Sequence, residues 1–278
     1  MKLVRYGAPG AEKPGMIDGS GQLRDLSGEI DDLVGAGLSL ASLDALKALD
    51  PASLPAVDGS PRLGPCVAHP GHFIAIGLNY ADHAKETGAP IPAEPIVFSK
   101  APSCLSGPFD DVIVPDGSEK LDWEVELAFV IGKRAHKVSE ADALSYVSAY
   151  AVCNDVSERA WQIEGTGQWM KGKSAPTFGP LGPWLVTADE VPDPQALDMW
   201  LDVNGTRRQT GSTKTMIFTV AQLVSYLSKI MILEVGDVVT TGTPPGVGMG
   251  HKPPMFLKRG DVMELSIAGL GTQKQSCI

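Results

Sequence analysis

The sequence predicts an α+β fold, a mixed β-sandwich roll preceded by a small N-terminal α+β domain. Three observations support this prediction. From residue 72 onward, most apolar segments are short, rich in β-branched residues and bounded by Gly or Pro, as strands are. Few segments have the apolar spacing of a helix. Strands and helices do not alternate regularly, which argues against a doubly wound parallel sheet.

The N-terminal domain is predicted for residues 1–68, and a larger domain for residues 69–278. The Pro-rich segment 50–65 marks the boundary between them. The elements expected before it are a strand, a strand pair around a Gly-Ser-Gly turn and a short amphipathic helix, at residues 1–7, 15–27 and 39–50.

The larger domain is expected to be mainly strands. Two of its segments have helical spacing, residues 138–148, with Ser139 as the capping residue, and residues 219–230. The segments expected to form strands are residues 73–78, 95–100, 112–115, 123–133, 148–156, 183–187, 198–205, 237–242 and 262–271.

Composition excludes several classes of function. Asp and Glu outnumber Lys and Arg by 33 to 23, and no basic cluster occurs, so a nucleic-acid partner is not expected. No apolar run approaches the ~20 residues that a membrane span needs. The N-terminus lacks the apolar stretch of a signal peptide, and the four cysteines lack the paired spacing of a disulfide framework or zinc site. These features predict a cytoplasmic protein.

Residues 167–174 read GQWMKGKS, which matches the G-x-x-x-x-G-K-S pattern of a P-loop. A P-loop requires a buried strand before the glycine loop and a helix that begins at the Lys-Ser pair. Residues 157–166 are polar, and Pro176, Pro180 and Pro183 prevent a helix from continuing after Ser174. We therefore interpret the match as coincidental.

Two acidic patterns are candidates for the chemistry. Strand alternation sends Glu124 and Glu126 to the same face, within ~7 Å of each other, where a hard divalent cation would relieve their repulsion. Asp155 follows an apolar strand and can supply a third oxygen ligand. The alternatives are that the glutamates form a solvent-facing strand edge and that Asp155 is a helix N-cap.

Six ordered blocks identify a resemblance over about residues 70–278. They read IGLNYADHAKE, EPIVFSKAPSCLSGP, DWEVELAFVIGK, NDVSERAWQ, KGKSAPTFGPLGP and TGTPPGVG. Their order and spacing resemble the fumarylacetoacetate hydrolase superfamily, and the N-terminal part resembles the bacterial subgroup that includes 2,4-diketo-3-deoxy-sugar-acid hydrolases. Many relatives in that subgroup carry the label ureidoglycolate lyase.

The resemblance implies the C-terminal fold of that superfamily, a homodimer, a small keto-acid substrate and one Mg²⁺ or Mn²⁺ per subunit. The founding enzyme of the superfamily has a further carboxylate ligand just before its tyrosine, and residues 76–79 contain none. The family resemblance also implies the site residues. They are Glu124, Glu126 and Asp155 for the metal, His83, Glu86 and Lys173 for catalysis, and Tyr80, Gln162 and Thr243 for substrate binding.

The predicted function is hydrolysis of the C3–C4 bond of a 2,4-dioxo acid, giving pyruvate and a small acid. The substrate would be 2,4-diketo-3-deoxy-L-rhamnonate or fuconate, or another acylpyruvate. His83 and Glu86 lie three residues apart, so one helical turn, ended by Gly88, would pair them as a base and its orienting carboxylate. Lys173 would offset the excess negative charge of the carboxylates.

Other functions remain open at this point. On the same scaffold, the chain could be an oxaloacetate decarboxylase, an isomerase or a ureidoglycolate lyase. More remotely, it could be a non-catalytic binding protein that kept the fold. The remaining histidines are expected to be exposed to solvent, at positions His69, His72, His136 and His251.

Overall fold

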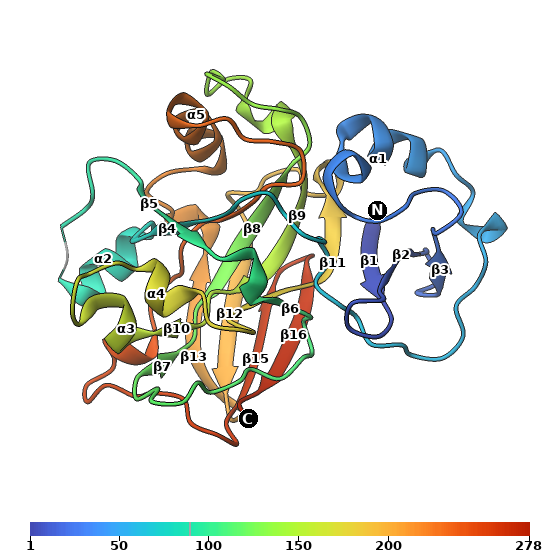
Figure 1. Ribbon diagram of the computed structural model, residues 1–278. Coiled ribbons are helices and arrows are strands. Elements are labelled where there is room, and N and C mark those ends of the chain that lie inside the picture. The colour runs from blue at the N-terminus through green and yellow to red at the C-terminus, as the bar shows by residue number, and fades with distance from the viewer. Residues whose placement is uncertain (89) are drawn as a thin grey trace.

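Two β-sheets form the centre of the protein (Figure 1), and the computed structural model describes residues 1–88 and 90–278. Within these residues the larger sheet has ten strands, in the order β3-β2-β1-β11-β9-β8-β14-β4-β5, with β6 beside β11. The pairs β14–β4 and β11–β6 are parallel, and the other neighbours are antiparallel. The strands are Lys2–Tyr6 (β1), Lys13–Ile17 (β2), Leu23–Asp25 (β3), Phe73–Gly77 (β4), Ile96–Lys100 (β5), Leu105–Ser106 (β6), Val125–Ile131 (β8), Val147–Asn154 (β9), Gly179–Thr187 (β11) and Val238–Thr240 (β14).

The smaller sheet packs against β8 and β9, which gives the sandwich. Its order is β13-β12-β15-β16, and buried residues alternate with less buried ones along β12 and β15. This alternation is that of a sheet with one face on the core. The predicted α+β, sheet-rich fold is therefore confirmed. The strands are Asp198–Val203 (β12), Thr206–Ser212 (β13), Val262–Ile267 (β15) and Gly271–Ser276 (β16), and a separate short pair is Leu121–Asp122 (β7) with Ser157–Glu158 (β10).

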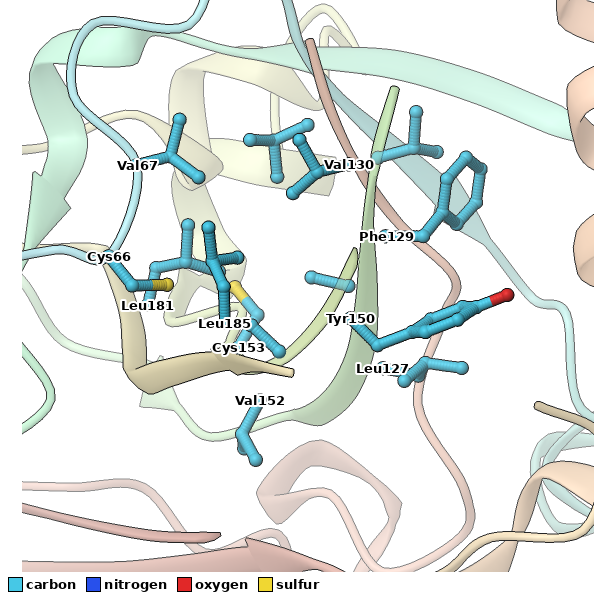
Figure 2. Close-up of a cluster of buried hydrophobic side chains, with 14 of the residues drawn as sticks. Cys66, Val67, Leu127, Phe129, Val130, Tyr150, Val152, Cys153, Leu181 and Leu185 are labelled. Atoms are coloured by element: carbon cyan, nitrogen blue, oxygen red, sulfur yellow. The ribbon is translucent and has the colours of Figure 1, made fainter. Parts of the chain in front are cut away.

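The core is centred on β8 and β9, all of whose residues are buried (Figure 2). Leu127 lies opposite Val152, and Phe129 opposite Tyr150, so large side chains pair across the two strands. Full burial of such a side chain stabilises the fold by roughly 1.5–3 kcal/mol. Any side chain at the ends of β8 and β9 is therefore attached to a rigid support.

The N-terminal strands extend the larger sheet. β1 pairs with β11, with Lys2 opposite Val186 and Leu3 opposite Leu185. Figure 1 shows β1–β3 and the nearby helix α1 (Leu40–Lys47) at one side of the molecule. The strands and helix expected before residue 68 all form. The sheet is continuous across that position, and the division at residue 68 stays a prediction.

Four further helices surround the sheets. Figure 1 shows α2, α3 and α4 on the side of the molecule opposite β1–β3. α2 ends at Gly88, whose φ of 69° is left-handed, so the turn predicted to carry His83 and Glu86 forms. α5 is the helix predicted for residues 219–230 and begins with a capping box made by Thr219 and Gln222. The four helices are Ala81–Thr87 (α2), Arg159–Ile163 (α3), Met170–Lys173 (α4) and Val220–Ile230 (α5).

Two local predictions are wrong. The helix expected at 138–148 is reduced to a 3₁₀ turn at Ala143–Tyr146, because the residues from Val147 onward pair with β8 instead. Ser139 Oγ accepts a hydrogen bond from the Asp142 amide, but Asp142 is the N-cap residue of that turn and no side chain caps it, so Ser139 is not the capping residue. The strand expected at 112–115 is reduced to a single bridge between Val112 and Cys277.

Candidate metal centre and active site

Three carboxylates meet where β8 begins and β9 ends. Glu124 immediately precedes β8, Glu126 lies within it, and Asp155 immediately follows β9. Val125 pairs with Asn154, so this register places the two strand ends side by side. One oxygen from each of the three carboxylates lies within 4.8 Å of the other two. All three residues are at most 6 % exposed, so the glutamates do not form a solvent-facing strand edge.

Buried cations surround these carboxylates. Lys173 Nζ, on α4, donates to Glu124 Oε2 and to Asp155 Oδ2, each at 2.7 Å. Arg159 Nη2, on α3, donates to Glu124 Oε1 at 2.6 Å. Lys100 Nζ, at the end of β5, donates to Asp155 Oδ1 at 2.5 Å and to the main-chain oxygen of Lys173. Positive charge therefore compensates Glu124 and Asp155 directly.

Glu126 is the least compensated of the three. Burial raises its pKa well above the ordinary value, and the nearby Asp155 and Glu124 carboxylates raise it further. The Gly242 amide donates a hydrogen bond to Glu126 Oε2 at 2.9 Å. Burial also opposes the ionisation of Glu124, but Arg159 and Lys173 outweigh it and lower the pKa of Glu124 to about 2. Burial and the neighbouring carboxylates therefore oppose the ionisation of Glu126.

The carboxylates form the floor of a cavity of about 200 Å³. Four other residues predicted for the site also line the cavity, and so does Arg159. The four are His83, Gln162, Lys173 and Thr243. The rest of the lining is mainly apolar, from Ile76, Leu78, Phe98, Ile163, Trp169 and Met249. The cavity therefore has a charged floor and an apolar wall.

The predicted dyad lies at this cavity. His83 Nδ1 is 3.0 Å from Glu86 Oε2, across one turn of α2. The two Glu86 oxygens accept hydrogen bonds from the Gly246 amide at 3.2 Å, which ties α2 to the loop that follows β14. His83 is 6 % exposed and lines the cavity, whereas Glu86 does not belong to the described lining and its side chain is 28 % exposed. A carboxylate in this position fixes the imidazole tautomer.

Two predicted substrate-binding residues differ in placement. The Thr243 hydroxyl lines the cavity, but it donates to the Val125 carbonyl at 2.9 Å and accepts from Gln209 Nε2 at 2.8 Å. Tyr80 is fully buried and does not belong to the described lining; its hydroxyl lies 3.5 Å from Met199 Sδ. Thr243 therefore lies at the cavity with the other predicted residues, whereas Tyr80 lies in the protein interior.

The sequence match agrees with this geometry. Residues 72–277 match the family described as Fumarylacetoacetate (FAA) hydrolase C-terminal. The chain belongs to this family. Family membership and the names of its relatives indicate an enzyme, and enzymes of the superfamily act on small molecules.

Three relatives of this family member cover nearly its whole length. A protein of Burkholderia cenocepacia, provisionally named a hydrolase, is 62% identical over 277 residues, covering 99% of this chain and 98% of that protein. Fumarylacetoacetate hydrolase from Exiguobacterium antarcticum has a TM-score of 0.89 at 36% identity and covers 100% and 99% of the two chains. Maleylpyruvate hydrolase from Sphingobium sp. SYK-6, in complex with manganese (II) ion and pyruvate, has a TM-score of 0.82 at 27% identity and covers 100% and 99%.

The carboxylates of this fumarylacetoacetate hydrolase family member fit a hard divalent cation. Mg²⁺ and Mn²⁺ prefer oxygen ligands, and Glu124, Glu126 and Asp155 offer buried carboxylate oxygens close enough to share one ion. A cation would also allow Glu126 to ionise, because it would supply the charge that this carboxyl lacks. The donor set therefore matches the metal that the family resemblance implies.

The sequence did not single out Asp122, Arg159 and Lys100 as parts of this site. Arg159 also donates from Nε to Asp122 Oδ2 at 2.8 Å and from Nη1 to Gln162 Oε1 at 2.9 Å. The available signal was that all three lie in the quoted blocks, Asp122 in DWEVELAFVIGK, Arg159 in NDVSERAWQ and Lys100 in EPIVFSKAPSCLSGP. No spacing in the sequence links Lys100 to Asp155, because the two residues lie 55 positions apart.

The remaining predictions have mixed outcomes. Residues 159–163 form α3, which Glu158 caps, so Asp155 is not the helix N-cap. Lys173 ends α4 and contacts carboxylates, an environment unsuited to a phosphate, so the P-loop interpretation has no structural support. His69, His72 and His136 are exposed as expected. His251 differs: it is half-buried, with its ring 6.2 Å from that of Trp123.

The helices of the described residues are all either too short or too polar to cross a membrane.

Proposed function

We propose that the protein is a divalent-metal-dependent hydrolase that cleaves the C3–C4 bond of a 2,4-dioxo acid, releasing pyruvate and a small acid. The observation that carries this proposal is the convergence of Glu124, Glu126 and Asp155 at the floor of a cavity that also presents the His83–Glu86 pair. The relative in complex with manganese (II) ion and pyruvate is a maleylpyruvate hydrolase, which supports the same class of reaction.

In this proposal the three carboxylates hold one Mg²⁺ or Mn²⁺ per subunit. When bound, such a cation supplies Lewis-acid polarisation of a ketone and a binding point for a neighbouring carboxylate. The substrate class fits this chemistry, because a 2,4-dioxo acid carries a carboxylate beside its C2 ketone. The homodimer remains a prediction from the resemblance, and the cytoplasmic location remains a prediction from the composition.

His83 is the proposed general base. With Nδ1–H donated to Glu86, the basic nitrogen is Nε2, and His83 lines the cavity, so it can take a proton from a water molecule directed at C4. Glu86 then stabilises the imidazolium that forms. The contact between Glu86 and the Gly246 amide keeps the carboxylate in place while the proton moves.

Lys173 and Gln162 are proposed to act on the substrate anion. Cleavage of the C3–C4 bond leaves negative charge on the pyruvate oxygen, and the buried Lys173 ammonium places a positive charge beside that position. Gln162 uses its amide oxygen to accept from Arg159 Nη1, which directs its NH₂ group elsewhere and makes it a donor for substrate. Thr243 and Tyr80, whose hydroxyls contact protein groups, would support the wall that the substrate meets.

Decarboxylation, isomerisation and lyase chemistry use the same carboxylates but require no attacking water. The paired His83 and Glu86 favour hydrolysis over these alternatives, because a base oriented by a carboxylate is what activation of water requires. A purely binding role would require neither the dyad nor the buried lysine. We therefore expect hydrolysis to be the main activity.

The test is release of pyruvate from a panel of acylpyruvates, diketo-deoxy sugar acids and oxaloacetate, with Mg²⁺ or Mn²⁺ and with EDTA. We expect metal-dependent release from 2,4-dioxo acids. His83→Ala should abolish hydrolysis and spare metal-dependent decarboxylation of oxaloacetate, whereas His136→Ala, at an exposed histidine, is the matched control. Activity that persists undiminished in excess EDTA would contradict the metal mechanism, and equal loss of both reactions would contradict the role of His83.

A further inference from the structure

We propose that the cavity selects 2,4-dioxo acids that carry a single carboxylate and an apolar acyl end, and discriminates against substrates with a second carboxylate. This inference rests on the proposed function, because it concerns the part of the same substrate beyond C4. Two features of the site support it: the charge balance of the buried cluster and the apolar wall above it.

The buried cluster has a defined charge balance. Among the described residues it contains four carboxylates and three cations, each at most 6 % exposed. One divalent cation and one substrate carboxylate would bring this set to neutrality. A second substrate carboxylate would enter the site without a counter-charge, and burying an unpaired charge is strongly unfavourable. The residues of the cluster are Asp122, Glu124, Glu126, Asp155, Lys100, Arg159 and Lys173.

The cations of the cavity already have partners. Arg159 donates from Nε, Nη1 and Nη2 to three different acceptors, at 2.6–2.9 Å, so it cannot turn toward a distal carboxylate without losing one of them. Lys173 Nζ contacts two carboxylates. The described part of the cavity lining contains no Lys or Arg other than these two residues. A dicarboxylate would therefore lack a cation for its far end.

The wall above the cluster is apolar and held in place. The Trp169 ring lies against the backbone of β4 so closely that a Cβ on Gly77 would be 2.3 Å from Trp169 Cζ3. Phe98 packs edge-on against the same ring, with centroids 5.3 Å apart. Ile163 and Met249 complete this wall. A preformed apolar wall favours an acyl chain over a charged group, because the wall offers no hydrogen bonds in exchange for lost hydration.

The size of the cavity sets a limit on the acyl chain. Its volume of about 200 Å³ lies below the roughly 300–1,000 Å³ of common ligand pockets. A short acyl group of a few carbons fits this volume with the pyruvyl part. The expected substrates are therefore small acylpyruvates with an uncharged end.

A matched pair of non-cleavable ligands tests the selectivity without turnover. 2-Oxoheptanoate and 2-oxoheptanedioate have the same chain length, differ by a methyl against a carboxylate at C7, and lack the C4 ketone that hydrolysis requires. Titration calorimetry of the Mn²⁺-loaded full chain should give a Kd at least tenfold lower for 2-oxoheptanoate. Equal affinities, tighter binding of the dioate, or binding of neither acid would overturn the inference.

A substitution in the wall tests the cause. Ile163 is 44% exposed at the end of α3, so Ile163→Arg adds a cation at the cavity without cutting into the core. The ratio of the two Kd values should move by at least tenfold toward the dioate. Ile230→Arg is the matched control: Ile230 is 58% exposed at the end of α5, outside the cavity lining, and its substitution should leave the ratio unchanged. An unchanged ratio in Ile163→Arg would overturn the argument from charge.

Turnover separates this inference from the proposed function. We expect pyruvate release from 2,4-dioxoheptanoate with a kcat/KM at least tenfold above that for 2,4-dioxoheptanedioate. Preferential binding of the monoanion with no cleavage of either dioxo acid would refute hydrolysis and leave the selectivity intact. Cleavage of both dioxo acids at equal kcat/KM would support hydrolysis and refute the selectivity.

Discussion

Replacement of Lys100 by Met should destabilise the protein strongly, although Lys100 does not line the cavity. Lys100 is 1 % exposed and donates to Asp155 Oδ1 at 2.5 Å and to the main-chain oxygen of Lys173. Burial opposes its charge, but the Asp155 carboxylate outweighs this effect and raises the pKa of Lys100, so the Lys100 side chain is charged at neutral pH. Methionine keeps an unbranched side chain that is one atom shorter, and it removes the charge and both hydrogen bonds.

The expected loss can be derived from these contacts. Removal of one partner from a buried ion pair costs about 3–5 kcal/mol, because the remaining charge stays buried. Asp155 keeps the Lys173 ammonium at 2.7 Å, so we expect the lower end, about 3 kcal/mol. At 2–4 °C for each kcal/mol in a chain of this size, Tm should fall by roughly 6–12 °C.

Differential scanning calorimetry in EDTA measures this effect directly. Lys229→Met, at an exposed lysine near the end of α5, is the control for loss of one positive charge and should change Tm by less than about 1 °C. A Tm for Lys100→Met within the same margin of the wild type would refute the reasoning. It would mean that the contact between Lys100 and Asp155 contributes nothing to the stability of the fold.

Three more outcomes follow from the same geometry. Burial and two acidic neighbours raise the pKa of Glu126, so in EDTA the folded state keeps a proton that the unfolded chain releases. The free energy of unfolding should therefore fall by up to about 1.4 kcal/mol per pH unit as pH rises above about 5. Urea denaturation measures this slope, and Glu126→Gln should remove it. Glu86→Gln should lower kcat by roughly tenfold to a hundredfold and leave the Mn²⁺ affinity in calorimetry unchanged, since Glu86 acts through its histidine partner; an equal loss of Mn²⁺ affinity would contradict this role. Gly172→Ala should destabilise the fold by about 1–3 kcal/mol in the same denaturation assay, because its Cβ would lie 2.4 Å from the Glu158 carbonyl oxygen, whereas Gly28→Ala, where nothing lies within 4 Å, is the control.

The sequence predicts the carboxylate cluster because local patterns determine it. Glu124 and Glu126 lie two residues apart at the start of one strand, and Asp155 directly follows another, so strand periodicity and strand ends make them candidates, and the family resemblance implies that they bind the metal. The burial of both faces of β8 was not evident, because alternating glutamates are also typical of an exposed edge. Only the packing of the second sheet against β8 and β9 decides between these interpretations.

The cations around the cluster follow from tertiary structure. Lys100 reaches Asp155 because β4 and β5 extend the same sheet, and no spacing in the sequence encodes that distance. The segment 138–148 shows the opposite effect. Its helical spacing is real, but Val147 and the residues after it gain more from pairing with β8 than a short helix could provide.

The most direct test of the account is an anomalous-diffraction map from crystals of the protein soaked in Mn²⁺. The account predicts one manganese peak per chain, within coordination distance of an oxygen from each of Glu124, Glu126 and Asp155. A map with no peak among these three carboxylates, or with a peak bound only by other residues, would contradict it.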